Sequence, residues 1–307
     1  CGRAKLAPNP LHIANLTNYP LPKRAYAMHK VQNRTVTSLI QLTTITFLAM
    51  ALMSFMFIES SSAPKAELWQ RWKTFNPASR ETIDHRQWDR FLRIYIKQDN
   101  NNINRVAYDQ LGAGGKSELE EYLKLLGGTP ISLFARNEQK AFWINLYNAL
   151  TVQLIAEYYP VASIRDIPLA WDKKLAKIEN VGLSLNDIEH RILRPIWRDA
   201  RIHYAINCGA LGFPNLLKVA FTGRNTSQLT ELAAHNYINQ HRGAHIKDGS
   251  LIVSKIYDWY KEDFGGTDQS VIAHLRAYAE FELLEGLKKK ESINNFEYDW
   301  GLNDIGS

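Results

Sequence analysis

Several short motifs that would assign an enzyme class are missing from this sequence. It contains no His-Glu-x-x-His zinc motif and no Gly-x-Ser-x-Gly nucleophile elbow. The stretch "GGKSELEEY" at 114–122 lacks the leading glycine of a phosphate-binding loop, so a nucleotide-binding P-loop is not expected. "HNYINQHRGAH" holds His235, His241 and His245 without a matching cysteine or carboxylate arrangement. We interpret it as a helix end followed by a turn, and we expect no metal site and no cofactor.

Charged residues are absent between Arg34 and Glu59. The stretch "TVTSLIQLTTITFLAMALMSFMFI" is long enough to cross a bilayer. Basic residues precede it and small residues follow it, which is typical of an export signal rather than of a buried core helix. We therefore expect a targeting region over 1–63, with a signal peptide or signal anchor at about 36–58. Met28 would be a natural start, which would make residues 1–27 an upstream extension.

The excess of positive charge belongs to this same region. Residues 1–63 hold six basic residues and one acidic residue, whereas the remainder holds 31 basic and 30 acidic residues. The net charge of +6 therefore gives no reason to expect a nucleic-acid-binding face. The expected location of the remainder is extracytoplasmic or periplasmic, with the membrane as a partner through 36–58 if this segment is not cleaved.

Cysteine is scarce as well, because Cys1 and Cys208 are the two in the chain. If the targeting region is removed, no intramolecular disulfide can stabilise the exported part. A lone thiol in an exported protein is a candidate reactive group.

The patterning from residue 64 onward predicts an α+β fold. We expect one mostly helical domain with a small antiparallel sheet, in which a helical N-terminal part (64–129) precedes the rest of the domain (130–302). The predicted helices are two within 66–95 split at Asn76-Pro77, one near 117–126, a buried one over 136–158, one from Ser184 to Arg194 stopped by Pro195, and an amphipathic one over 254–264. Short strands are expected in 104–111 and 201–207.

Three carboxamides are candidate substrate-binding residues. Asn145 and Asn148 stand three apart on the predicted 136–158 helix and share one face. Asn207 lies at the end of the predicted strand. Buried carboxamides need hydrogen-bond partners. One interpretation is that they bind backbone groups of a neighbouring loop, and the other is that one of them orients a catalytic imidazole or the substrate.

The 184–194 segment contributes two candidate catalytic residues. Ser184 and Asp187 resemble a capping box at its start. Glu189 lies between apolar residues on adjacent turns, so it is expected to be partly covered and to need a partner. The candidate partners are Arg194, Arg198, Arg201 and His203. A structural ion pair is the alternative to a catalytic Glu189, and His190 could equally be an exposed residue without a role.

Cys208 follows the predicted strand "RIHYAIN" and precedes "GALGFPNL". Gly209 and Gly212 permit a tight turn beside it. A cysteine at such a turn can become a nucleophile when nearby amides or an imidazole lower its pKa. The competing interpretation is a small buried side chain at the end of a core strand, because free cysteine is among the most buried residue types.

Five ordered blocks carry a family resemblance. They are "AFWINLYNAL", "LSLNDIEHRILRP", "RIHYAINCGALGFPNL", "LIVSKIYDWYKEDFGG" and "FEYDW-GLN". Over roughly 130–302 the chain resembles the Domain of Unknown Function 547 family. Members of that family often carry a second cysteine directly before the proline of the third block, where this chain has Phe213. This departure argues against a dithiol redox pair or a two-cysteine metal site.

Three functional hypotheses follow. The first is a thiol-dependent hydrolase or acyl-transfer enzyme of the cell envelope, acting on a peptide, amide or ester. In it Cys208 is the nucleophile, His203 or His190 the base, and Glu189 or an asparagine the orienting group. The second is a non-catalytic envelope module that binds a small-molecule or peptide-like ligand, or a partner, in the same cleft. The third is a structural or interaction protein in which these blocks are simply core.

Overall fold

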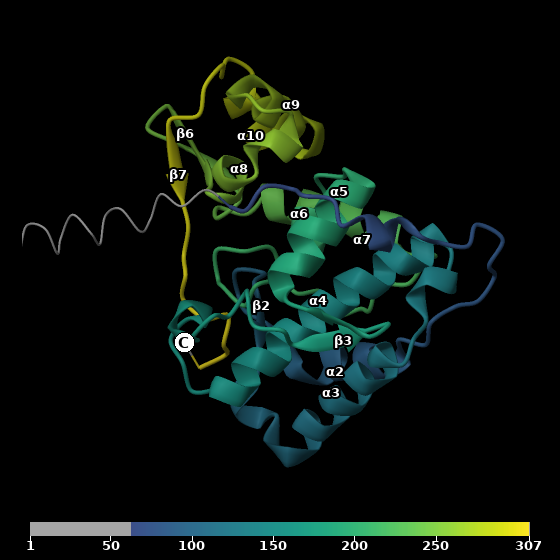
Figure 1. Cartoon of the computed structure of the whole chain (residues 1–307). Coiled ribbons are helices and arrows are strands. Elements are labelled where there is room, and N and C mark those ends of the chain that lie inside the picture. Colours follow the sequence, from purple (N-terminus) through teal and green to yellow (C-terminus); the bar gives the residue numbers. More distant parts are fainter. Residues whose placement is uncertain (1–62, 307) are drawn as a thin grey trace, which may run out of the picture. The chain divides into compact units, whose positions relative to one another are not determined.

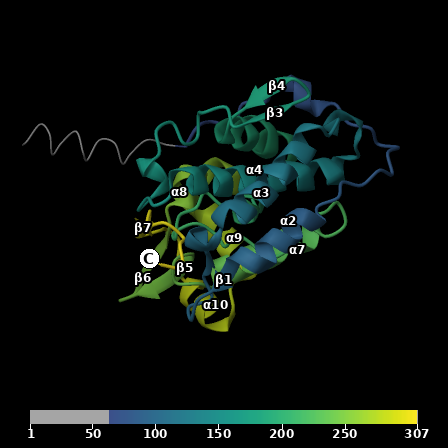
Figure 2. The same cartoon turned by 90° about the horizontal axis from the view of Figure 1, so that it is seen from below.

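Helix α4 (Arg136–Tyr158) is the element around which the other helices pack. It is buried on nearly every side from Glu138 to Ala156. The helix ends before Pro160, which has no N–H to donate and disfavours helical backbone in the residue before it. The structure confirms the predicted 136–158 helix with both of its ends. In Figures 1 and 2 helix α3 (Gly112–Gly127) lies beside α4, and α2 (Arg86–Tyr95) packs on α3.

The computed structural model describes residues 63–306, which belong to one compact unit. The expected targeting region, including the apolar segment 36–58 and the extension 1–27, lies outside the described residues apart from Ala63. Within 63–306, none of the helices combines the length and the apolar character that a membrane span requires.

The part before α4 consists of short elements and one longer helix pair, and it packs on α4 through α3. The elements are η2 (Gln70–Lys73), α2 (Arg86–Tyr95), β1 (Ile96–Gln98), β2 (Asn104–Val106), η3 (Tyr108–Gln110), α3 (Gly112–Gly127) and η4 (Ile131–Leu133). The predicted pair of helices in 66–95 therefore becomes one 3-10 turn and one helix. The predicted strand in 104–111 is shorter than expected and continues as a 3-10 turn.

After α4 the chain forms a hairpin and then an unusual helix. The elements are η5 (Ile164–Asp166), β3 (Ala176–Ile178), β4 (Val181–Leu183), the π-helix η6 (Asp187–Leu193), α5 (Arg194–Trp197) and α6 (Ile202–Ala205). The prediction that Pro195 stops the helix was wrong. Pro195 lies where η6 continues into α5, and the carbonyl groups of His190 and Arg191 in the preceding turn accept from the backbone N–H groups of Glu67 and Trp69.

The predicted strand over 201–207 was also wrong, because these residues include the helical turn α6. Ile202 and Tyr204 alternate with His203 and Ala205 as in a half-buried strand, but all four are buried. The alternation therefore did not separate an inner from an outer face. The carboxylate of Asp199 accepts a hydrogen bond from the backbone N–H of Arg201 and supports the start of the turn.

The C-terminal part combines helices with a three-stranded sheet (Figure 1). Its elements are α7 (Thr226–Ile238), β5 (Ala244–Lys247), β6 (Ser250–Ser254), α8 (Ile256–Trp259), η7 (Lys261–Phe264), α9 (Asp268–Tyr278), α10 (Phe281–Leu287) and β7 (Asn295–Glu297). The predicted 254–264 helix is thus divided into α8 and η7. The expected α+β class is confirmed, but the sheet is mixed: β5 and β6 are antiparallel, whereas β6 and β7 are parallel.

The C-terminal segment after β7 returns to the middle of the molecule. Leu302 forms a bridge with Ala210, and the backbone N–H groups of Leu211 and Gly212 donate to Gly301 and Asp299. Gly212 has to be a glycine here, because a Cβ would lie 2.6 Å from the backbone nitrogen of Asp299. The turn that follows Cys208 is therefore held by residues almost a hundred positions away.

Asn145 joins α4 to the loop before α7 with both ends of its carboxamide. Its Nδ2 donates to the carbonyl of Phe221 at 2.7 Å, and its Oδ1 accepts from the N–H of Phe221 at 3.1 Å. We predict that Asn145→Ala lowers the free energy of unfolding by about 2–4 kcal/mol, because two buried backbone groups lose their partner. Urea unfolding of the full chain, followed by tryptophan fluorescence, measures this.

Asn137→Ala is the matched control. Asn137 is exposed and makes one hydrogen bond, to the carbonyl of Gly223. This control is expected to change the free energy of unfolding by less than about 0.5 kcal/mol. Equal effects of the two substitutions would show that the Asn145 bonds contribute no more than exposed ones.

Candidate functional site

The π-helix η6 brings Glu189 and His190 into the core. π-helical segments are rare and are found frequently at functional sites. The predicted capping arrangement is present at its start, since the carboxylate of Asp187 accepts from the backbone N–H and the hydroxyl of Ser184. Glu189 and His190 are 2% and 4% exposed. The expectation that Glu189 is covered holds, whereas the alternative that His190 is an exposed residue was wrong.

Glu189 has a phenol and two imidazoles around its carboxylate. Its Oε2 accepts a hydrogen bond from the hydroxyl of Tyr147 at 3.1 Å. Its Oε1 lies 3.9 Å from Nδ1 of His203 and 4.0 Å from Nδ1 of His190, with no hydrogen-bond partner among the described residues. Of the four partners proposed from the sequence, His203 is the one beside the carboxylate. Arg194 pairs with Asp263, and Arg201 pairs with Asp199 and Glu231, whereas no ion pair of Arg198 is present among the described residues.

His203 lies between the two carboxylates. Its Nε2 is 2.7 Å from Oδ2 of Asp263. Because a carboxylate accepts, Nε2 carries the proton and donates it, and Nδ1 is left facing Glu189. The ring of Tyr260 stacks on the imidazole, with 4.0 Å between the ring centroids. This stacking and the bond to Asp263 fix the orientation of the imidazole.

Asp263 accepts a second charge-assisted hydrogen bond, from Nε of Arg194 at 2.6 Å. Burial opposes ionisation of this carboxyl, but the hydrogen bonds from His203 and Arg194 hold its pKa well below the ordinary value. Arg194 also donates to the carbonyl of Pro64 and to Nδ1 of His190. Burial lowers the pKa of His190, and its Nδ1 is an acceptor, so the neutral ring carries its proton on Nε2.

Cys208 is buried next to this cluster, with 4% of its surface exposed. Its Sγ lies 3.5 Å from the hydroxyl of Tyr298, and within residues 63–306 no hydrogen bond joins it to a histidine. Burial raises the pKa of the thiol from 9.0 to about 11, although the bond to Tyr298 opposes this rise. The thiol is therefore protonated at neutral pH, whereas a nucleophile needs the thiolate.

The backbone beside Cys208 has the predicted tight turn. Gly209 adopts a φ of +82°, and a Cβ there would lie 2.3 Å from Cδ1 of Ile155. Glycine is thus required at this position both by the backbone conformation and by the close approach of α4.

The other two candidate carboxamides hold this turn in place. Asn148 donates to the carbonyl of Ala205 and accepts from the N–H of Asn207. Asn207 accepts from the N–H of Gly209 and donates to the carbonyl of Pro214. Both side chains, like Asn145, therefore bind backbone groups of neighbouring loops. A substrate-binding role for them stays a prediction.

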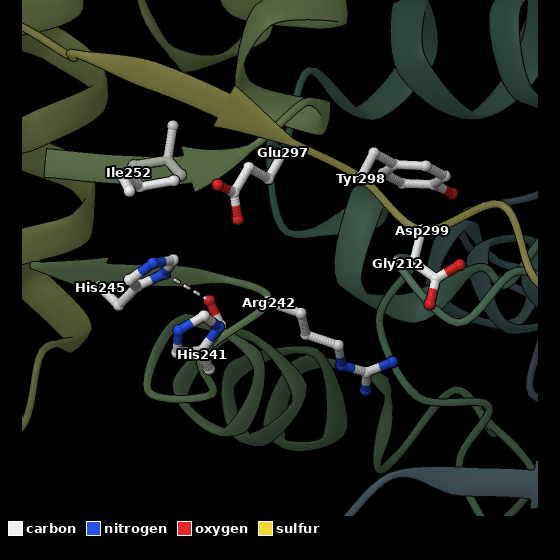
Figure 3. Close-up of a pocket in the computed structure, with 9 residues that line it drawn as sticks. Gly212, His241, Arg242, His245, Ile252, Glu297, Tyr298 and Asp299 are labelled. Atoms are coloured by element: carbon white, nitrogen blue, oxygen red, sulfur yellow. Dashed lines mark hydrogen bonds between the residues drawn. The ribbon is translucent and has the colours of Figure 1, made fainter. Parts of the chain in front are cut away.

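A cavity of about 400 Å³ opens on the other side of Tyr298 (Figure 3). Its lining comes from the turn after Cys208, the loop between α7 and β5, the strands β5 and β6, and the segment from β7 onward. The residues are Gly212, His241, Arg242, His245, Ile252, Val253, Glu297, Tyr298 and Asp299. Sequence reasoning missed Glu297, Tyr298 and Asp299 as site residues, although all three lie in the quoted block "FEYDW-GLN". Their position depends on the return of the C-terminal segment, which leaves no periodic signal.

Metal binding has no support from the described side chains. Within residues 63–306 no group of three histidine, cysteine, aspartate or glutamate side chains is arranged to hold a metal ion. His241 and His245 stack on each other, with 3.6 Å between their ring centroids.

Residues 131–238 match the family model described as "Protein of unknown function, DUF547". This match confirms the resemblance to the family over these residues. The matched part runs from η4 to the end of α7, so it contains Glu189, His190, His203 and Cys208. The blocks that begin at Leu251 and Phe296 lie beyond it. No curated protein and no solved structure matches the chain.

The ion pairs of Asp263 predict a pH dependence. Because the folded state lowers the pKa of this carboxyl, its stabilising effect is complete above the ordinary value of 3.8 and is lost as the pH falls further. We expect Asp263→Asn to lower the free energy of unfolding by about 2–3 kcal/mol at pH 7. The difference from wild type should shrink below about pH 4. Urea unfolding at several pH values measures it.

Asp258→Asn is the control, because Asp258 is exposed and its side chain makes no hydrogen bond or ion pair within the described part of the chain. It should leave the curve of stability against pH almost unchanged. A difference for Asp263→Asn that stays constant down to pH 2 would contradict the ionic role of Asp263.

Proposed function

We propose that this protein is a non-catalytic ligand-binding module, and that the cavity beside Tyr298 is its binding site. The observation that carries the proposal is the state of Cys208. Its thiol is buried, its pKa is raised to about 11, and its hydrogen-bond partner is the phenol of Tyr298. A thiol in that state has little nucleophilic character.

The positions of the two imidazoles also argue against Cys208 as a nucleophile. A base for Cys208 would have to accept its proton directly or through one water. Nε2 of His203 is engaged by Asp263, its Nδ1 lies 3.9 Å from the carboxylate of Glu189, and Nδ1 of His190 accepts from Arg194. The imidazoles are therefore directed to other members of the buried cluster. Removing Asp263 from this cluster would leave Arg194 without its compensating charge, which is the mark of a structural network.

The cavity offers what a binding site needs. Its volume falls within the range of small-molecule sites, which combine apolar walls with a few polar groups. Ile252 and Val253 supply apolar surface, Tyr298 an aromatic ring, and Glu297 and Asp299 carboxylates (Figure 3). The thiol-dependent hydrolase or acyl-transfer enzyme with Cys208 as nucleophile is the competing function.

Thiol labelling separates the two functions. In the full chain carrying Cys1→Ser, we predict that iodoacetamide labels native Cys208 at pH 7 at least about 100-fold more slowly than a model thiol. The reason is that a pKa of about 11 instead of 9.0 reduces the thiolate fraction by that factor. Mass spectrometry of the Cys208 peptide, with and without urea, measures the rate.

Fast labelling of the folded protein at pH 7 would overturn the binding-module proposal. A covalent acyl adduct on Cys208 after incubation with p-nitrophenyl acetate would then identify the hydrolase. Cys208→Ser is the matched variant, because it removes the thiol and keeps a side chain of similar size. Protected Cys208 that becomes reactive in urea supports the proposal.

We also propose that the folded part is exported. The support is the uncharged segment 36–58 with basic residues before it, which is typical of a signal peptide or anchor. A reporter enzyme that is active only outside the cytoplasm, fused after Ser307, should be active in cells. Replacing Leu48 and Leu52 by arginine should abolish this activity, since charges in the apolar segment oppose insertion. Activity of a cytoplasm-only reporter at the same junction would contradict export.

A further inference from the structure

We infer that the cavity beside Tyr298 binds a linear alkyl diammonium compound, an inference that rests on the proposed binding function. The cavity joins two open carboxylates to apolar walls, and its strongest hydrogen-bond donor, Arg242, is already engaged. A ligand that fits it must therefore donate hydrogen bonds, carry positive charge and bury methylene groups.

Arg242 is the strong donor among the lining residues, and its hydrogen bonds are directed to the protein. Its guanidinium donates to the carbonyls of Leu211 and Phe213 and to the side chains of Asn215 and Gln240. Every guanidinium nitrogen thus donates to a protein acceptor, either in the segment after Cys208 or in the side chain of Gln240. Arg242 therefore has no free pair of N–H groups for a bidentate hydrogen bond to an anionic ligand.

Apart from the ring of His241, which offers one N–H, the other polar side chains of the lining present mainly acceptors to the cavity. Glu297 makes no side-chain hydrogen bond or ion pair within residues 63–306, and Asp299 uses one oxygen to accept from the N–H of Gly301. Nδ1 of His245 lies 2.8 Å from the carbonyl of His241, so Nδ1 carries the proton and Nε2 of the neutral ring is an acceptor. Two carboxylates against one guanidinium leave the lining with an excess of negative charge.

The spacing of the two carboxylates indicates two ammonium groups. Glu297 ends β7 and Asp299 stands two residues later, and in Figure 3 both side chains lie on the side of the segment that faces Arg242. Residues two apart on an extended chain are about 7 Å apart. A short diamine such as cadaverine can place one ammonium group at each carboxylate.

The apolar part of the cavity lining can pack against the methylene groups of the diammonium ligand. Ile252 and Val253 of β6 line the cavity together with the ring of Tyr298. Tyr298 packs against Trp259 and Trp300, with ring centroids 4.8 and 4.6 Å away. The ring therefore has a fixed position in the wall of the cavity.

Isothermal titration of the full chain in a non-ionic detergent tests the inference with four probes of similar length. Cadaverine carries two ammonium groups, pentylamine one, pentanediol none, and glutarate two carboxylates. We expect cadaverine to bind most tightly and pentylamine more weakly. Pentanediol and glutarate should give no measurable heat.

Three variants locate the binding. Glu297→Gln should weaken cadaverine binding at least about tenfold, because a charge-assisted hydrogen bond is lost. The double variant Glu297→Gln with Asp299→Asn should abolish it. Glu262→Gln removes an exposed carboxylate of η7 outside the cavity and should leave the dissociation constant unchanged. Native tryptophan fluorescence of each variant shows that the variant is folded, so that a weaker binding reflects the lost carboxylate.

The remaining outcomes overturn the inference in different ways. Equal binding of pentanediol and cadaverine would identify a neutral, hydroxyl-bearing ligand. Equal losses in Glu262→Gln and Glu297→Gln would show binding to the acidic surface in general. No heat with any probe would also refute the diammonium ligand, while the binding-module proposal would still be decided by the labelling of Cys208.

Discussion

The chain of hydrogen bonds from Arg194 through Asp263 to His203 is the interaction on which the middle of this protein depends. It connects η7 to α5 and α6, which lie 60 to 69 residues earlier in the sequence, through donor–acceptor distances of 2.6 and 2.7 Å. Removing one member would leave a buried charge without compensation, which is strongly destabilising. The chain also reaches Pro64 through Arg194, so the first described residues are attached to the same network.

This network determines the state of Cys208. The thiol lies close enough to Glu189 for that carboxylate to raise its pKa further, in addition to the larger effect of burial. A nucleophilic cysteine needs the opposite field, from a nearby cation or an imidazolium. Here the arginine and the imidazole are turned toward Asp263. Cys208, His203 and Glu189 thus lie near one another, but the negative charge of Glu189 favours the protonated form of the thiol.

The sequence predicted the elements that depend on residues close together in the chain. Apolar residues on every side of 136–158 predicted a buried helix, and the spacing of Ser184 and Asp187 predicted the cap of η6. The helical turn α6 was not predictable, because burial of both Ile202 and His203 erases the difference between a helical and a strand pattern. The π-helix and the pairing of β7 with β6 depend on contacts between distant segments, which leave no local period.

The placement of the cavity follows from the same distant contacts. Tyr298 reaches Cys208 with its hydroxyl and lines the cavity with its ring. Phe213, which stands where the resemblance implies a second cysteine in many relatives, packs edge-on toward that ring, with 6.5 Å between the centroids. An aromatic ring in this position adds apolar surface around the thiol, and apolar surroundings raise the pKa of a cysteine. The turn around Cys208 is thus a buried element of the core, whereas the carboxylates of Glu297 and Asp299 are exposed and line the cavity beside Tyr298.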